Sequence, residues 1–183
     1  MENIKLLEIK GYYNKVNMFE FSEEQSWNGH VILREDLTFE GIVVDEYSNV
    51  TTENRLIYGT LVDYNGASLM KFSKINICPC SFFGMSNGKE IFGTWAIHNY
   101  YSARDMGRCK IVFKEIPLVE EMVQSIESKI DMFKEEMDDY AIWLYLSFIE
   151  KMPITVQEFL KNLEECKKEV EAELGFSIKK LEL

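Results

Sequence analysis

Several stretches that read as β-strands carry a glycine beside an aromatic residue. The pairs are Trp27 and Gly29, Phe39 and Gly41, Tyr58 and Gly59, Phe83 and Gly84, and Phe92 and Gly93. A glycine inside a strand weakens it, and is retained where a sheet bends sharply and a nearby ring covers the bare backbone. The alternative is that some of these glycines, such as Gly84, lie in turns. The repeated pattern predicts a sheet that bends at strand after strand.

The first two thirds of the chain divide into short strands joined by tight turns. Asn65-Gly66 and Asn87-Gly88 favour type I′ hairpin turns, and Glu35-Asp36 also fits a hairpin. The predicted strands cover residues 4–13, 28–34, 37–45, 55–64, 67–73, 80–86, 89–98 and 108–116, with 17–21 as a further candidate. A meander of this length forms either a sandwich or a barrel, and the glycines favour the barrel. We therefore expect an antiparallel meander β-barrel of eight or nine strands.

The chain changes character after Pro117. Apolar residues recur every three or four positions over 118–137, which predicts a helix. Residues 140–152 are apolar nearly all round, which predicts a buried helix. Residues 153–175 begin with a capping box and end at a glycine, which predicts a third helix.

These patterns predict that the chain has two parts. Residues 1–117 are expected to form the barrel, and residues 118–183 an acidic helical extension of two or three helices packed on it. The fold class is thus mainly β with a helical extension (α+β). The tail 176–183 is expected to be a short strand or an arm.

The charge of the chain limits its partners. The formal net charge is −11, and residues 118–183 carry 8 basic against 16 acidic side chains, a net charge of −8. An acidic surface repels phosphate, which argues against nucleic acid and anionic membranes as partners. The sequence has no apolar run of the ~18 residues that a transmembrane helix needs and no secretory signal at its start. We expect a cytoplasmic protein.

No catalytic or cofactor motif stands out. The phosphate-binding loop, the nucleophile elbow and the zinc-protease motif are all missing from the sequence. The pair Cys78 and Cys80 is a weak metal signal, because common zinc sites use wider spacing and more histidines. We predict no cofactor and no metal, and no residue set supports an enzyme.

The strand pattern has a family resemblance. The stretches "KGYYNKVNMFEF", "WNGHVILREDLTFEGIVVDE", "LIYGTLVD" and "IFGTWAI" resemble the aromatic–glycine strands of the lipocalin-like (calycin) barrels, including uncharacterised bacterial members. The Gly-x-Trp of that family lies on its first strand, whereas Gly93-Thr94-Trp95 comes late here. The resemblance covers about residues 4–116. It implies a barrel that holds a small apolar ligand.

The segment after Trp95 is the main candidate site. Loops on a rigid scaffold often carry function, and aromatic and cationic groups there would grip an anionic or planar ligand. The alternative is that its tyrosines close the barrel end and its charges pair at the surface. We predict as ligand-binding residues Tyr58, Trp95, His98, Tyr101 and Arg104.

Strand periodicity leaves one question open. Within 91–98 one face carries Ile91, Gly93, Trp95 and Ile97, and the other carries Phe92, Thr94, Ala96 and His98. If the second, mixed face points inward, the interior has a polar group for a ligand. If it points outward, the interior is a packed core.

Two functions follow from these observations. The leading hypothesis is a non-enzymatic binding protein that takes a small apolar or aromatic ligand in the barrel interior or mouth. The alternative is a protein–protein interaction module, in which the acidic helices bind a protein partner or a second copy and the barrel is a scaffold.

Overall fold

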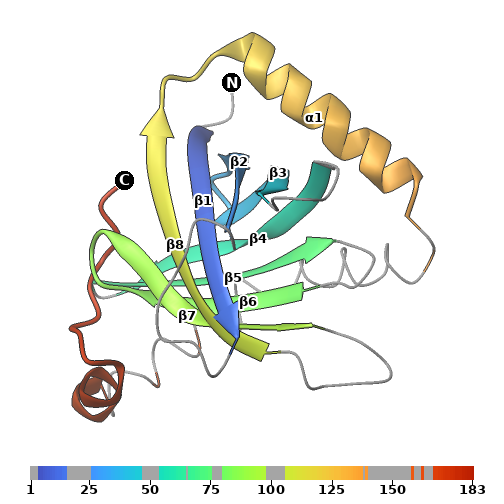
Figure 1. Ribbon diagram of the computed structural model, residues 1–183. Helices are drawn as coiled ribbons and strands as arrows, with labels where there is room; N and C mark the ends of the chain where they lie inside the picture. The colour runs from blue at the N-terminus through green and yellow to red at the C-terminus, as the bar shows by residue number, and fades with distance from the viewer. Residues whose placement is uncertain are drawn as a thin grey trace.

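The computed structural model describes residues 4–15, 26–46, 54–64, 66–75, 80–97, 106–137, 139, 158, 162 and 167–183. Eight strands in these residues form one closed antiparallel barrel, in which each strand pairs with the next (Figure 1). They are β1 (Lys5–Lys15), β2 (Ser26–Leu33), β3 (Thr38–Glu46), β4 (Asn54–Tyr64), β5 (Ala67–Ile75), β6 (Cys80–Ser86), β7 (Glu90–Ile97) and β8 (Met106–Ile116). The predicted meander barrel is confirmed. The further candidate strand, 17–21, lies outside the described residues.

The barrel closes because its first and last strands pair. The register of β1 with β8 runs from Leu6 opposite Ile116 to Lys15 opposite Gly107. Closure satisfies the backbone hydrogen-bonding groups that an open sheet would leave at its two edges.

Glycines allow neighbouring strands to approach closely. A Cβ atom built on Gly93 would lie 1.8 Å from the carbonyl oxygen of Phe83 on β6, and one on Gly41 would lie 2.0 Å from that of His30 on β2. Gly93 also stands directly opposite Gly84 in the register. At these points the neighbouring backbone occupies the space that a side chain would need, so the predicted bends have a steric basis.

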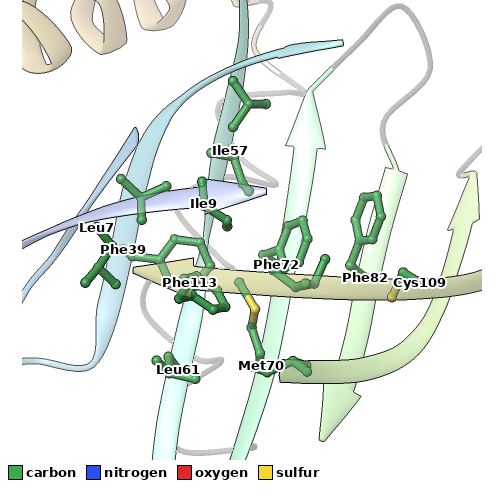
Figure 2. Close-up of a cluster of buried hydrophobic side chains, with 14 of the residues drawn as sticks. Leu7, Ile9, Phe39, Ile57, Leu61, Met70, Phe72, Phe82, Cys109 and Phe113 are labelled. Atoms are coloured by element: carbon green, nitrogen blue, oxygen red, sulfur yellow. The ribbon is translucent and has the colours of Figure 1, made fainter. Parts of the chain in front are cut away.

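The inward side chains form one packed group, here called the interior cluster. Its buried members are Leu7, Ile9, Trp27, Val31, Phe39, Val43, Ile57, Leu61, Met70, Phe72, Cys80, Phe82, Ile91, Trp95, Cys109, Ile111, Phe113 and Leu181. Figure 2 shows the rings of Phe72 and Phe82 side by side, and they stack with centroids 4.4 Å apart. Trp27 meets both rings edge-on. The face of β7 with Ile91 and Trp95 therefore points inward, and the mixed face points outward.

Helix α1 (Glu120–Glu135) covers part of the outer surface beside β2 and β3 (Figure 1). It buries Val123, Ile126 and Ile130 against outward side chains of the strands, among them Leu56 and Tyr58. The predicted helix over 118–137 is thus confirmed. No helix among the residues that the structure describes is long and apolar enough to cross a membrane.

A buried carboxylate on β3 helps to hold α1 on the barrel. The side chain of Glu40 on β3 is only 7% exposed and pairs with Arg34 at 2.8 Å and with Lys134 of α1 at 3.1 Å. Two cations thereby compensate the buried carboxylate, and one of them ties the helix to the sheet.

The C-terminal tail closes one end of the barrel. Residues 167–174 are helical, and the helix ends at Gly175, whose φ of 75° suits the predicted helix stop. Lys179 then forms a parallel bridge with Asn87, and its N–H donates to the carbonyl of Ser86 at 2.9 Å. Leu181 joins the interior cluster, so the tail is an arm that seals the end where β5 begins and β6 ends. The predicted helix 140–152 lies outside the described residues.

We predict that Gly93→Ala destabilises the protein by about 1–3 kcal/mol, because its Cβ would overlap the backbone of Phe83. Thr94→Ala is the control, since Thr94 is exposed on the outer face. Urea unfolding of both variants measures the difference. Equal stability of the two variants would show that close backbone approach does not govern closure.

Candidate functional site

Polar and aromatic side chains gather inside the barrel at the end where β1 finishes and β2 begins. Asp45 stands two positions after the buried Val43, so both share the inward face of β3. Arg55 and Lys74 stand in the same way two positions from the inward residues Ile57 and Phe72. Together with three aromatic residues they form what we call the charged end: Tyr13, Trp27, Asp45, Arg55, Lys74 and Trp95.

Three ionic side chains meet at the charged end. The Nζ atom of Lys74 forms a salt bridge and hydrogen bond with Oδ1 of Asp45. The Nε atom of Arg55 lies 3.8 Å from Oδ2 of the same carboxylate. These side chains are only 6% (Lys74), 11% (Asp45) and 17% (Arg55) exposed, so water screens their charges weakly.

Aromatic rings surround the ammonium group of Lys74. Its Nζ atom lies 5.8 Å from the ring centroid of Tyr13 and 5.9 Å from that of Trp27. The faces of such rings attract a cation. Tyr13 in turn contacts Trp95 edge-on, with centroids 5.8 Å apart. The charged end thus presents rings and cations together.

The two tryptophans of the charged end differ in their hydrogen bonding. Nε1 of Trp95 donates to the backbone carbonyl of Asn14 at 2.9 Å. Nε1 of Trp27 is equally buried, yet finds no acceptor among the described residues. The Trp27 ring lies against Gly11, where an added Cβ would come within 2.1 Å of it. A buried donor without an acceptor costs about 1–3 kcal/mol, so Trp27 is an energetic exception in this barrel.

The interior contains two cysteines, and the thiol of Cys109 is a poor nucleophile near neutral pH. Cys80 and Cys109 are both buried, and neither forms a disulfide. Burial raises the pKa of Cys109 to about 12, against a smaller lowering by its hydrogen bond with the backbone of Gly93. That thiol stays protonated near neutral pH, whereas the thiolate is the reactive form. Over the part of the chain that the structure describes, no three His, Cys, Asp or Glu side chains gather as a metal site would require.

The structure separates the two predicted ligand-binding residues that it describes. Trp95 is in the interior cluster at the charged end. Tyr58 is on the outer face of β4, buried beneath α1. Burial raises the pKa of Tyr58, and a hydrogen bond with Ser73 lowers it to a smaller extent. His98, Tyr101 and Arg104 lie outside the described residues.

Sequence reasoning missed the ionic residues of the charged end. The signal was present, because each of Asp45, Arg55 and Lys74 continues the apolar alternation of its strand with a charge. Each strand has two faces, and only the pairing of all eight strands into a barrel shows which face of each strand points inward. Trp27 belongs to the aromatic–glycine pattern, and neither Trp27 nor Tyr13 is among the predicted site residues.

Comparison of the chain with protein-family models, with curated proteins and with solved structures finds no match. The closed eight-stranded barrel is compatible with the lipocalin-like resemblance of the sequence. Functional reasoning therefore starts from the side chains of the charged end.

We predict that Trp95→Phe costs about 1–2 kcal/mol more stability than Trp27→Phe. Both changes remove the same ring atoms, but only the first breaks a hydrogen bond, that with Asn14. Urea unfolding of the two variants without added ligand measures this difference. A larger loss for Trp27→Phe would mean that its indole N–H has an acceptor.

We predict that the protein loses stability at alkaline pH because the buried thiol of Cys109 stays protonated in the folded chain. Its pKa rises on folding from 9.0 to about 12, so above about pH 9 the unfolded chain loses a proton that the folded chain keeps. The resulting fall in the free energy of unfolding is about 1.4 kcal/mol per pH unit, present from about pH 9 up to the folded pKa. Cys109→Ala should flatten this fall in urea unfolding measured at pH 9 and pH 10. An unchanged slope would contradict the raised pKa.

Proposed function

We propose that this protein is a binding protein that takes a small aromatic or apolar molecule at the charged end of its barrel. The observation that carries the proposal is the buried Nε1–H of Trp27, for which the described part of the chain offers no acceptor. A ligand oxygen or nitrogen would satisfy this donor and remove the cost of leaving it unpaired.

The surroundings of Trp27 favour a flat ligand. Tyr13 and Trp95 supply further ring surface at the same end. Aromatic rings gain from edge-to-face and offset contacts with other rings, beyond the area that they bury. A planar apolar body with one hydrogen-bond acceptor matches these groups.

The packing of the interior limits where along the barrel a ligand can bind. The rings of Phe72 and Phe82 stack on each other inside the barrel (Figure 2), and Trp27 contacts Phe82 edge-on. At the opposite end Leu181 of the tail belongs to the same cluster. We therefore assign the ligand to the charged end and not to the centre of the barrel.

The other sequence hypotheses stay predictions. They are membership of the lipocalin-like family, a cytoplasmic location, the division at residue 117, and ligand binding by Tyr58, His98, Tyr101 and Arg104. The alternative function, binding of a protein partner or a second copy through the acidic helices of 118–183, also stays a prediction. Light scattering of the purified protein would reveal a second copy.

A matched pair of tyrosines tests the proposed site. Tyr13 faces the interior cluster, whereas its neighbour Tyr12 lies between Lys10 and Lys110 on the outside. We predict saturable binding of the neutral fluorescent ketone 6-propionyl-2-dimethylaminonaphthalene, whose carbonyl oxygen can accept the Trp27 N–H. Its binding should be weakened about tenfold by Tyr13→Ala and unchanged by Tyr12→Ala. Tenfold corresponds to about 1.4 kcal/mol, within the range of one aromatic contact. Absence of binding, or equal weakening by both variants, would overturn the proposal.

A further inference from the structure

We infer that the charged end binds an aromatic aldehyde covalently, as a protonated imine on the side-chain nitrogen of Lys74. This inference rests on the proposed function and specifies both the chemical class of the ligand and the group that reacts with it. It follows from three neighbouring groups: a buried primary amine, a carboxylate bonded to it, and an indole N–H that no described residue accepts.

Lys74 places a primary amine inside the barrel, where a lysine is rarely found. Its side chain is only 6% exposed, and its Nζ atom lies within 6 Å of the ring centroids of Tyr13 and Trp27. A lysine amine condenses with carbonyl compounds, whereas a guanidinium keeps its proton and does not. A flat carbonyl compound that binds against these rings therefore lies beside a nucleophilic nitrogen.

The Trp27 indole supplies a hydrogen bond for the carbonyl oxygen of the ligand. Its Nε1 atom is buried and has no acceptor in the described part of the chain, and the same ring approaches Lys74. The carbonyl oxygen gains negative charge as the amine adds, so a hydrogen bond to it strengthens during the reaction. Among flat ligands with one acceptor, an aldehyde is thus the class that uses both the donor and the amine.

Asp45 accepts and returns the proton that the condensation requires. Its Oδ1 atom is hydrogen-bonded to the Lys74 ammonium and takes one proton from it. The free amine attacks the aldehyde carbon, the carbonyl electron pair moves to oxygen, and a proton passes from nitrogen to that oxygen. Asp45 then returns its proton to the hydroxyl group, which leaves as water while the nitrogen lone pair forms the C=N bond. The products are a protonated imine, water and the original carboxylate.

The reaction leaves the charges of the site unchanged. One ammonium becomes one iminium, so Asp45 faces the same positive charge before and after, independently of the contacts that Arg55 makes. The rings of Tyr13 and Trp27 attract either cation. Because the amine and the carboxylate are largely buried, little water reaches the imine to hydrolyse it.

The backbone ladder already joins the strands that this ion pair connects. Lys74 lies on β5 and Asp45 on β3, and β4 pairs with both strands. A buried ion pair rarely stabilises a fold more than apolar residues of similar volume would. A chemical role accounts for a buried lysine that the stability of the barrel does not require.

Two probes that share a dimethylaminonaphthalene body test the inference. 6-Dimethylamino-2-naphthaldehyde carries the aldehyde, and the ketone 6-propionyl-2-dimethylaminonaphthalene, which tests the proposed function, is its less reactive counterpart. The full chain is mixed with an equimolar amount of either probe and treated with sodium cyanoborohydride. Intact-mass and peptide mass spectrometry should find a single aldehyde adduct per chain, located at Lys74, and no ketone adduct.

Three variants assign the reaction to its residue. Lys74→Met and Lys74→Arg should each abolish labelling of this segment, and the arginine keeps a positive charge opposite Asp45. Lys71→Met removes a lysine from the opposite face of β5 and should leave the labelling unchanged. Circular dichroism confirms that each variant is folded.

Asp45 gives a second readout, the absorption of the adduct before reduction. A protonated imine of this naphthalene absorbs at longer wavelength than the neutral imine, and a neighbouring carboxylate favours the protonated form. The wild-type adduct should show the long-wavelength band at neutral pH. Asp45→Asn should weaken that band and slow adduct formation at least about tenfold, whereas the loss of a merely structural carboxylate would change neither.

The outcomes separate the two proposals. If the ketone binds but no adduct is trapped, or if labelling spreads over exposed lysines, the imine is overturned and the proposed function stands. An Asp45→Asn variant that reacts at the wild-type rate with the wild-type spectrum would overturn the part assigned to Asp45. If neither probe binds, the function and its ligand class fail together.

Discussion

Close approach of neighbouring backbones at inward glycines is the constraint on which this structure depends. At Gly93 and Gly41 the carbonyl oxygen of the next strand occupies the place of a side chain. Strands that come this close bend strongly, which lets β8 return to β1 and close the sheet. Closure then fixes one face of every strand as interior. Closure therefore determines which side chains form the interior cluster and which lie at the charged end.

The closed barrel has two unlike ends. At one end the tail is hydrogen-bonded to Ser68 and Ser86, and Leu181 completes the apolar core. At the other end Asp45, Arg55 and Lys74 occupy the inward positions nearest that end on three successive strands, at the finish of β3, the start of β4 and the finish of β5. The stacked rings of Phe72 and Phe82 lie next to Trp27 in the same interior. The low polarity of that core strengthens every electrostatic interaction at the charged end.

Much of the fold was predictable from local chemistry. Gly66 and Gly88 have the positive φ angles that their Asn-Gly turns predict, and the strands between them alternate as expected. The turn between β2 and β3 was less accessible. It places Leu37 at a φ of 69°, which its sequence does not suggest, and the backbone is held there by hydrogen bonds from Leu61 and Thr60 to the Leu37 carbonyl. Those contacts come from a strand 23 residues away in sequence.

The candidate site was predictable only in part, for a reason of geometry. A ring that directly precedes an inward glycine must point outward, as Tyr58 does before Gly59. A ring two positions before such a glycine points inward, as Trp27 does before Gly29. This spacing rule identifies Trp27 and Phe39 as interior residues from sequence. The meeting of Asp45 with Lys74 depends instead on the register of three strands, which no local pattern fixes.

The most direct measurement of the central claim is the NMR signal of the Trp27 indole N–H. The chain has three tryptophans, so the indole region of a ¹⁵N–¹H correlation spectrum is simple, and the two phenylalanine variants assign the Trp27 and Trp95 signals. The account predicts that 6-propionyl-2-dimethylaminonaphthalene moves the Trp27 signal downfield and slows the exchange of this proton with water. The Trp95 signal should stay in place, because the Trp95 N–H keeps its hydrogen bond to Asn14. A Trp27 signal that does not move at a saturating concentration of this ketone would contradict the claim that the Trp27 N–H binds the ligand.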